Sequence, residues 1–509
     1  IYTLTAEHAP DVEGVDVTIL SSDRDSTYVV VLCLREQAEL VENALRQGGF
    51  ARPSQLCDEI PKVEQENLTA EIGLLEKQIE VCQNHIKECA DKRAQLRVIS
   101  DYFRTRAQKY EVLGTIPQSE KTFLISGYVP KKAANAVKKA MEENYDLVVE
   151  IEEIKEEEEA PVVLSNNGFS ESVEGVLESY GLPKKGEVDP TFIMSFFYVF
   201  FFGLMLSDAA YGLVIFLACF IAIKKFPRME RGMYKSLKMF MYCGLSTLVW
   251  GVLFGGYFGD AIDVVARTFF HVDVPSTGLI KAVWFVPLND PMRLLMYSML
   301  FGVIHLFMGL GIKGYMLAKE KQYMDFFCDV IWYVFLIGLI LMLLPSSIFA
   351  SISQIPAGTF PPAVSVTGKV MAIAGAVGLL LMSGRANKNV ALRLALGAYD
   401  IYNVTGWLSD VLSYSRLLAL GLATGVIASV VNQMGSMLGD GILGAIGFIV
   451  VFIIGHTLNL AINLLGAYVH TNRLQFVEFF GKFYEGGGKP FNPFKLTTKY
   501  VDVKEETYL

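Results

Sequence analysis

The chain of 509 residues is 52% hydrophobic and 19% charged, with a formal net charge of −9, and this composition excludes an ordinary soluble enzyme. Residues 1–186 hold 21 basic and 34 acidic residues, whereas residues 187–509 hold 23 and 19. The first third is therefore typical of a soluble, acidic part, and the rest is apolar with sparse charge. The acidic part argues against nucleic acid as a partner, because binding phosphates requires a basic face.

The cysteines predict no metal site. No C-x-x-C pair occurs, and the seven residues are scattered, at Cys33, Cys57, Cys82, Cys89, Cys219, Cys243 and Cys328. This spacing is typical of reduced thiols rather than of a metal or disulfide framework, so we expect no metal and no cofactor. The sequence begins with Ile1 rather than Met, and we expect a natural N-terminal segment to be missing from it.

Residues 1–52 are predicted to form a membrane-distal α/β lobe that is N-terminally incomplete. Residues 15–20 and 27–34 are rich in Val and Ile, which is typical of strands. Residues 35–47 are predicted to form a helix, because Gly48 and Gly49 follow it directly as an end signal.

Residues 53–113 are predicted to form one long helix, called the rod here. A lone helix of this length cannot bury an apolar stripe, so a heptad pattern favours a coiled coil with a helix from the missing N-terminal part or from another chain. The alternative is an ordinary amphipathic helix of a bundle. The apolar positions alternate in steps of four and three through Leu68, Ile72, Leu75, Ile79, Cys82, Ile86 and Cys89, and Leu96 and Phe103 continue the frame.

A second, membrane-proximal α/β lobe is predicted for residues 114–154. Its elements are a strand at 122–129, a helix at 131–144 and a strand at 146–154. An acidic run at 156–159 follows and indicates a solvated linker, which we extend over residues 155–190. The sequence has no P-loop, no H-E-x-x-H and no G-x-S-x-G motif, so we expect a non-catalytic protein.

Residues 191–480 are predicted to form an all-α polytopic membrane domain, and residues 481–509 a cytoplasmic tail. Most of the apolar stretches are long enough for the ~20 residues that span a bilayer. The last two of them predict long, tilted helices. The stretches cover residues 192–223, 239–258, 294–318, 326–344, 366–383, 399–435 and 442–470.

The basic residues of the loops predict the topology, because short cytoplasmic loops carry an excess of Lys and Arg. Residues 224–238 hold six basic residues, and residues 345–363 hold none. If the acidic part is cytoplasmic, every basic loop lies inside only when the first stretch enters the membrane and returns. Ser207 and Asp208 lie in the middle of that stretch, so two short crossings or a re-entrant pair fit. We predict about eight passes with both ends cytoplasmic; the alternative is a single tilted helix.

Arg416 lies near the middle of the stretch 399–435, where a charged side chain costs about 3 kcal/mol or more. It cannot escape this cost by deprotonation. Asp410 precedes it by six residues, too far round a helix for a clean pair, so we find no convincing partner within the chain. We expect a nearby carboxylate or a water-filled path. The structural alternative is a buried pair with Asp410, Asp400 or Asp329.

Arg473 is a second cation at the end of a long apolar stretch, with His470 three residues earlier on the same helix face. A helix over residues 442–473 would be about 48 Å long, which exceeds a bilayer core of about 30 Å. Either the helix tilts steeply and keeps Arg473 in the membrane, or Arg473 anchors at the cytoplasmic surface.

These stretches resemble subunit I, also called subunit a, of the rotary V/A-type ATPases in its prokaryotic form. The most specific motifs are DIYNVTGWLSDVLSYSRLLALGLA at 400–423 and HTNRLQFVEFFGKFYEGGG at 470–488. Further agreement comes from SGYVP at 126–130, YGLP at 180–183, DPTF at 189–192, FFGLMLSDAAYG at 201–212 and VWGVLFGG at 249–256. One departure is Ala210, where the family often has Gly. The resemblance covers essentially the whole chain.

The resemblance implies a non-catalytic stator subunit that translocates H⁺ or Na⁺. Arg416 would face the c-ring, a rotating ring of small membrane subunits that each carry one buried acid. A nearby Arg lowers the pKa of such an acid and makes it release its ion. Arg473 and His470 would also face the ring, which favours the steeply tilted helix. The soluble lobes would contact peripheral-stalk subunits, and the central-stalk socket subunit and the lipid bilayer would be further partners.

Other polar residues at membrane depth are candidates to line the two aqueous half-channels, although for each alone a structural hydrogen bond explains it equally well. Two competing interpretations remain. A stand-alone secondary transporter with a regulatory arm would need an internal repeat, and the halves contain no convincing one. A purely structural membrane anchor would leave Arg416 unexplained. The candidate lining residues are Asp208, His305, Asp329, Asp410, His456, Asn459, Asn463 and Glu478.

Overall fold

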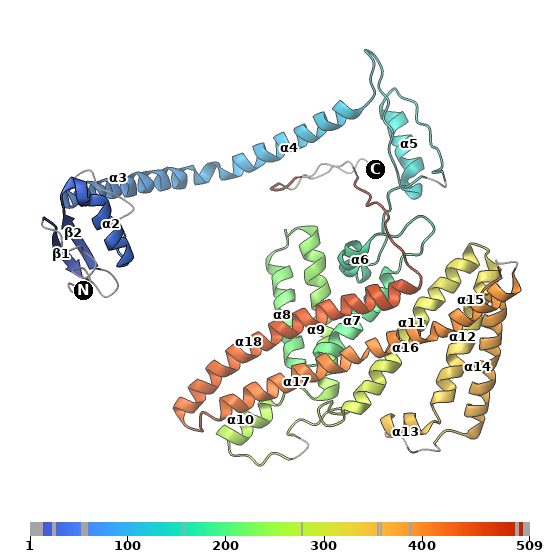
Figure 1. Ribbon diagram of the computed structural model, residues 1–509. Coiled ribbons are helices and arrows are strands. Elements are labelled where there is room, and N and C mark those ends of the chain that lie inside the picture. The colour runs from blue at the N-terminus through green and yellow to red at the C-terminus, as the bar shows by residue number, and fades with distance from the viewer. Residues whose placement is uncertain are drawn as a thin grey trace. The chain divides into compact units, whose positions relative to one another are not determined.

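The computed structural model describes residues 14–22, 27–51, 60–155, 158–275, 278–353, 356, 359–385, 389–493 and 498–501. They belong to two units. The first is Ile1–Ile125 together with Lys495–Leu509, and the second is Ser126–Phe494. Helices dominate both units, and all helices from α5 onward belong to the second (Figure 1).

The first unit begins with a two-stranded antiparallel sheet, β1 (Asp16–Ser22) and β2 (Thr27–Leu32). A 3-10 turn leads to α2 (Ala38–Gln47), which buries Val41. The amide of Gly48 donates to the carbonyl of Ala44 at 3.1 Å and ends the helix. The two strands and the helix predicted for this lobe are therefore confirmed.

The rod consists of α3 (Pro61–Glu88) and α4 (Arg93–Thr115). A 3-10 turn at Cys89–Lys92 divides it, where the sequence predicts one continuous helix; the tighter winding shifts the side chains that follow. Leu75 and Ile79 of the heptad stripe stay 49% and 57% exposed, so the coiled-coil pairing remains a prediction. Residues 53–59 lie outside the described residues.

The second lobe differs from its prediction. Helix α5 (Lys131–Asn144) is confirmed, but residues 122–129 and 146–154 are not strands. Apart from an isolated bridge between Gln118 and Phe123, these described segments form no backbone ladder. Residues typical of strands are not enough to form one, because the backbone groups of a strand need a paired neighbour.

Part of the predicted acidic linker is folded. Residues 170–173 form a 3-10 turn and α6 (Glu174–Tyr180) follows, with Val173 and Leu177 fully buried. The ammonium group of Lys235, on helix α9 (Arg231–Phe254), contacts the carboxylate of Glu174 at 2.6 Å and holds this segment against the helix. The apolar side chains of residues 170–180, which the sequence predicts as part of the acidic linker, therefore join the core of the second unit.

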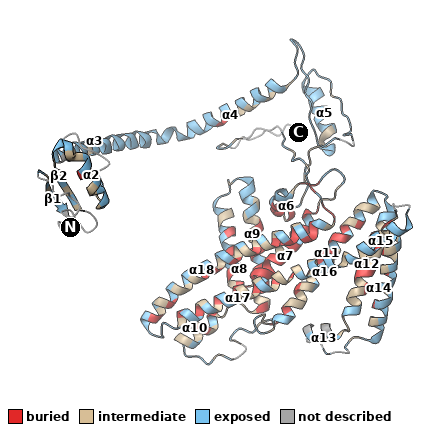
Figure 2. Cartoon of the chain, in the orientation of Figure 1, coloured by how far each residue is buried: buried red, intermediate tan, exposed pale blue. Residues whose placement is uncertain are grey.

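Helix α7 (Thr191–Leu206) lies at the centre of the second unit, called the membrane unit here (Figure 2). Eleven of its 16 residues are buried, whereas Phe192 and Phe196 are exposed. It ends at Ser207, whose φ of 35° lies in the left-handed region. Asp208 then caps α8 (Ala209–Lys225), since its carboxylate accepts from two amides of the first turn. The chain is thus interrupted where the sequence predicts two short segments.

Helices α8 and α9 (Arg231–Phe254) form an antiparallel hairpin, with Gly212 against Leu248 and Gly251 against Ala209. Small residues let two helix backbones approach this closely.

Helix α7 runs in the same direction as α9, because Gly203 faces Ser246 and Ser207 faces Gly256. Since α8 is antiparallel to α9, the chain reverses its direction between α7 and α8. This reversal is compatible with an entering and returning segment.

Helices α10 to α15 follow along the chain. Of these, α10 and α11 pack against α17 (Ser415–Ser436), whereas α12 and α15 pack against α14. Helices α12 and α14 pack closely, because Gly338 and Gly375 bring their backbones together, and Gly397 does the same for α15 against α14. The helices are α10 (Ala261–Phe269), α11 (Pro291–Lys319), α12 (Tyr323–Leu343), α13 (Ser347–Ser353), α14 (Pro362–Met382) and α15 (Val390–Tyr402).

The last helices form a long antiparallel pair. Helix α16 (Val404–Ser413) leads into α17 (Ser415–Ser436), and α18 (Ile442–Arg473) returns beside it (Figure 1). A π-helical segment (Leu474–Phe479) and a 3-10 turn (Phe480–Lys482) continue α18. The two long helices predicted near the C-terminus are confirmed.

Six helical segments of the described residues are long and apolar enough to cross a membrane, and α7 is a shorter apolar helix of 16 residues. The chain is therefore a mostly helical, multi-pass membrane protein with a small sheet. Eight passes and the orientation of the termini remain predictions. The six segments are Arg231–Phe254, Pro291–Lys319, Tyr323–Leu343, Pro362–Met382, Val390–Ser436 and Ile442–Lys482.

Candidate functional site

Arg416 lies in the first turn of α17, directly after the break between α16 and α17. Its Nη1 donates to Oε1 of Glu478 at 3.1 Å, and its Nη2 donates to the hydroxyl of Ser413 at 3.3 Å. The Arg416 side chain is 21% exposed, and that of Glu478 is 2% exposed. One side of the guanidinium thus contacts a buried carboxylate, while part of the Arg416 side chain stays accessible.

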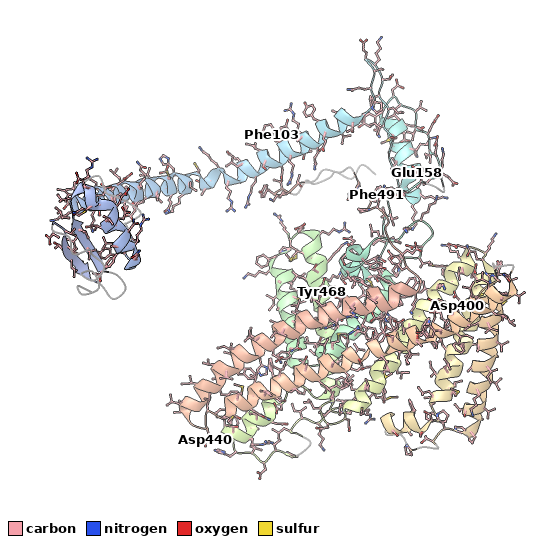
Figure 3. The ribbon with its side chains drawn as sticks, viewed as in Figure 1. Phe103, Glu158, Asp400, Asp440, Tyr468 and Phe491 are labelled. Carbon is pink, nitrogen blue, oxygen red and sulfur yellow. The ribbon has the colours of Figure 1, made fainter. Side chains whose placement is uncertain are left out.

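The expectation that Arg416 lacks a partner within the chain is wrong. The partner is Glu478, which is 62 residues away, and not Asp410, Asp400 or Asp329. Those three carboxylates have other neighbours. Asp410 pairs with Lys482, Asp329 pairs with Lys313 at 3.0 Å, and Asp400, labelled on α15 in Figure 3, accepts from Asn403 at 3.2 Å.

The π-helical segment after Arg473 brings Glu478 to Arg416. Its hydrogen bonds span five residues, so the chain turns less per residue than in an α-helix. Within this segment, Gln475, Glu478 and Phe479 are buried and Val477 is exposed. A π-helical stretch frequently marks a functional site, and here it positions the counter-ion of the central arginine.

His470 and Arg473 lie in the last turn of α18, across the helix pair from Arg416. His470 is half-buried and within electrostatic range of both arginines, whereas Arg473 is exposed. Among the described residues, Nδ1 of His470 has no hydrogen-bond partner and Arg473 forms no ion pair. Two cations and a histidine thus meet at one end of the α17–α18 pair.

A buried polar cluster adjoins this end, called the Arg416 cluster here. His305 on α11 bonds the hydroxyl of Tyr414 through Nδ1 at 2.8 Å and stacks on Phe479 with ring centroids 4.2 Å apart. Gln475 lies beside His305, close enough to influence its imidazole through a side-chain hydrogen bond. In the described part of the chain, Oε2 of Glu478 has no hydrogen-bond partner, and a buried polar atom of this kind is suited to contact water.

A second polar network, the Asn432–Asn463 network, follows the interior of the α17–α18 pair. His456 bonds Oδ1 of Asn432 through Nε2 at 2.9 Å and the hydroxyl of Tyr211 through Nδ1 at 2.5 Å. Asn459 donates to the same hydroxyl at 2.9 Å, and Asn463 donates to the carbonyl of Asn459 at 2.9 Å. These side chains form a continuous row from the loop before α10 toward the middle of the pair.

Asp208 has a structural position. One carboxylate oxygen accepts from the amides of Ala210, Tyr211 and Phe258 at 3.0 to 3.1 Å, and the other accepts from Gly259 at 2.8 Å. The carboxylate therefore clamps the loop after α9 to the start of α8. That loop supplies the Phe258 carbonyl, to which Asn432 donates at 2.8 Å.

The structure divides the predicted site residues into groups. Arg416, Glu478, His470 and Arg473 meet, with His305 behind them, and Lys482 ties Asp410 nearby. His456, Asn459 and Asn463 belong to the Asn432–Asn463 network, and Asp329 lies apart on α12. Sequence reasoning missed Tyr211, Ser413, Tyr414, Asn432, Gln475 and Lys482, of which Asn432 and Gln475 were detectable as polar residues within apolar stretches.

Comparisons with known proteins agree with the family resemblance of the sequence motifs. The family model described as "V-type ATPase 116kDa subunit family" matches residues 52–262 and 401–496, which include α7 to α9 and the whole α17–α18 pair.

Several named relatives match most of the chain. The A-type ATP synthase subunit I of Methanocaldococcus jannaschii is 32% identical over 93% of this chain and 70% of that relative. The Pyrococcus horikoshii subunit I is 31% identical over 94% and 70%, and the Chlamydia pneumoniae V-type ATP synthase subunit I is 24% identical over 74% and 61%. The chain belongs to the V-type ATPase 116kDa subunit family, as a relative of A-type and V-type ATP synthase subunit I.

Proposed function

We propose that the chain is the non-catalytic stator subunit of a rotary V/A-type ATPase. It would form the ion half-channels against the c-ring and link the membrane motor to the peripheral stalks. The observation that carries the proposal is the Arg416–Glu478 pair, in which an arginine with about a fifth of its side chain exposed lies at the end of a long helix pair.

The first support is the uncovered apolar face of α18. Its residues recur at helical spacing and are each at least half exposed, and Arg473 follows one turn after the last of them. An apolar face can contact lipid directly, but a charged side chain on that face needs a counter-ion. A ring of helices that carry acidic groups would contact the apolar face and supply the counter-ion. The face consists of Ile446, Val450, Ile453, Leu458, Ile462, Leu465 and Val469.

The second support is the electrostatics of Arg416. A guanidinium keeps its charge under all conditions of the cell and makes planar, weakly hydrated contacts with carboxylates. A ring acid that meets Arg416 would be held in its charged form and would release its ion there. When no ring acid is present, Glu478 would neutralise Arg416 and limit the cost of a bare charge.

The third support is the separation of the two polar regions. The Arg416 cluster contains His305, Gln475 and Glu478, and the Asn432–Asn463 network lies further along the α17–α18 pair. Two half-channels that open on opposite sides of the membrane need two separate polar regions. A fixed cation, here Arg416, would lie between the ring and the half-channels. H⁺ or Na⁺ would pass, depending on the acid of the ring.

The soluble lobes would hold the membrane unit against rotation. We assign the contact with peripheral-stalk subunits to these lobes and the contact with the central-stalk socket subunit to the same cytoplasmic side. The relatives are named as subunits of ATP synthases, which agrees with a part in a larger complex.

The test is Arg416→Ala in the reconstituted holocomplex. We expect ATP-driven ion transport to be lost while the complex stays intact by gel filtration, because the ring acid loses its charged partner. Arg385→Ala is the matched control, since Arg385 also pairs with a carboxylate, Asp325, but lies outside the Arg416 cluster. Transport that persists in Arg416→Ala would show that this arginine is structural.

Arg416→Lys sharpens the test. Lysine keeps a positive charge but lacks the planar fork, and it can deprotonate when buried. We therefore expect poor transport in this variant too. Wild-type transport by Arg416→Lys would contradict the electrostatic account.

A further inference from the structure

Asp101 is a buried residue on α4, a helix whose other residues are mostly exposed. The neighbouring residues of α4 are accessible, and Phe103, labelled in Figure 3, is 59% exposed, whereas Asp101 is only 3% exposed. A carboxylate is rarely buried unless it is paired or fully hydrogen-bonded. Its burial comes from a segment near the other end of the chain.

Three consecutive backbone amides bind this carboxylate. Oδ1 of Asp101 accepts from the amide of Lys499 at 3.0 Å, and Oδ2 accepts from the amides of Tyr500 at 2.7 Å and Val501 at 2.9 Å. Hydrogen bonds of this kind to an ionised acceptor are about twice as strong as neutral ones. The arrangement is an anion nest in which the anion belongs to the rod and the nest to the tail.

The charges around Asp101 favour its ionised form. Burial acts to raise the pKa of the Asp101 carboxyl, but the three amides, assisted by Arg104, bring the pKa below its ordinary value. Arg97, one turn earlier on α4, lies over the ring of Tyr500 with its guanidinium carbon 5.8 Å from the ring centroid. Arg97 and Asp101 thus make a two-point contact with the tail.

We propose that Asp101 and Arg97 form a docking site on the rod for an extended peptide backbone, and that the chain's own C-terminal segment Lys499–Val501 occupies it. The carboxylate recognises backbone amides, so it selects an extended conformation rather than particular side chains. Tyr500 adds the one side-chain contact, through the cation–π interaction with Arg97.

The docked tail closes a long loop of the chain. Asp101 and its three donors are separated by 398 to 400 residues, which include the whole membrane unit. The chain therefore leaves the unit that contains the rod and returns to it with its C-terminal segment.

Hydrogen–deuterium exchange on the assembled complex tests the docking. In Asp101→Asn the amide group offers one acceptor oxygen and turns an NH₂ toward the donors, so we expect the Lys499–Val501 amides to exchange about tenfold faster or more. The matched control is Asp91→Asn, an exposed acid of the same rod. Exchange of the tail that is equal in the wild type and Asp101→Asn would overturn the proposal.

A second pair of variants leaves the rod unchanged. Val501→Pro removes one of the three donors, whereas Val501→Ala keeps it. We expect faster exchange at Lys499 and Tyr500 in Val501→Pro only. Equal exchange in the two variants would contradict binding through the backbone, even if Asp101→Asn disturbed the rod helix, which the exchange of residues 93–115 reports.

Discussion

Arg416 keeps about a fifth of its side chain accessible, although its guanidinium is paired with a nearly buried carboxylate. Removing one partner of a fully buried pair costs about 3–5 kcal/mol, because the other charge is left uncompensated. The exposure of Arg416 reduces this cost and leaves room for a second acid. The pair is therefore suited to open toward an incoming carboxylate rather than to lock the fold.

The sequence indicates the importance of Arg416 but not its partner. A positive charge within an apolar stretch is visible by inspection, and Glu478 is visible as an acid beyond the next stretch. Their pairing depends on the antiparallel packing of α17 and α18 and on the π-helical segment, and neither has a reliable local signal. For the same reason Asp208 could be singled out, but its clamp on the loop after α9 could not.

Glu478→Gln tests the charge of the partner. Glutamine keeps the shape and one hydrogen bond to Arg416 but removes the negative charge, so we expect lower ion transport and a loss of stability of roughly 1–3 kcal/mol. Transport assays and thermal unfolding of the purified complex measure the two effects.

Glu485→Gln is the control for Glu478→Gln, because Glu485 pairs with Lys184 at an exposed surface site, where a salt bridge contributes about 0–1 kcal/mol. If the two variants were equally active and equally stable, Glu478 would have no special role beside Arg416.

Glycines determine how the helices of the membrane unit pack. A Cβ atom on Gly251 would lie 1.9 Å from the backbone nitrogen of Ala209, and one on Gly212 would lie 2.3 Å from that of Leu248. Backbone atoms cannot yield to such contacts as a flexible side chain can. The α8–α9 hairpin therefore requires glycine at these positions, and the hairpin in turn supports the Asp208 clamp.

Gly251→Ala is expected to weaken the α8–α9 hairpin, because one methyl group forces the two backbones apart at a cost of about 1–3 kcal/mol. Gly406 on α16 is the matched control, since a Cβ there meets nothing within 4 Å and alanine favours a helix. The midpoint temperature of thermal unfolding should fall for Gly251→Ala and should stay the same or rise for Gly406→Ala. The reverse order would mean that the hairpin packs differently.

Helices with a regular spacing of apolar residues could be predicted from the sequence, whereas strands that depend on a neighbouring strand could not. The helices at 131–144 and 442–473 follow from periodicity and length, and the structure has them at these bounds. The strands predicted at 122–129 and 146–154 have the right composition, but among the described residues they form no ladder beyond the isolated bridge at Phe123. Helices satisfy their backbone internally, whereas strands need a second segment, which composition cannot supply.

At the scale of the whole molecule, the predicted membrane topology rests on the charge of the loops and on the reversal of chain direction between α7 and α8. Each of these helices, with 16 and 17 residues, is about 25 Å long, slightly shorter than a bilayer core of about 30 Å. If the chain enters the membrane with α7 and returns with α8, both ends of this pair lie on one side of the membrane. We predict that this side is cytoplasmic, because the six basic residues at 224–238 follow α8.

Pro227→Cys tests this topology, because Pro227 is exposed in the basic loop between α8 and α9. We expect a membrane-impermeant thiol reagent to label it only from the cytoplasmic side, as read by mass spectrometry of the tagged peptide. Asp273→Cys, in the exposed loop between α10 and α11, should be labelled only from outside. Labelling of Pro227→Cys from outside would mean that residues 192–223 cross once, which would put the basic loop on the unfavourable side and reverse α9.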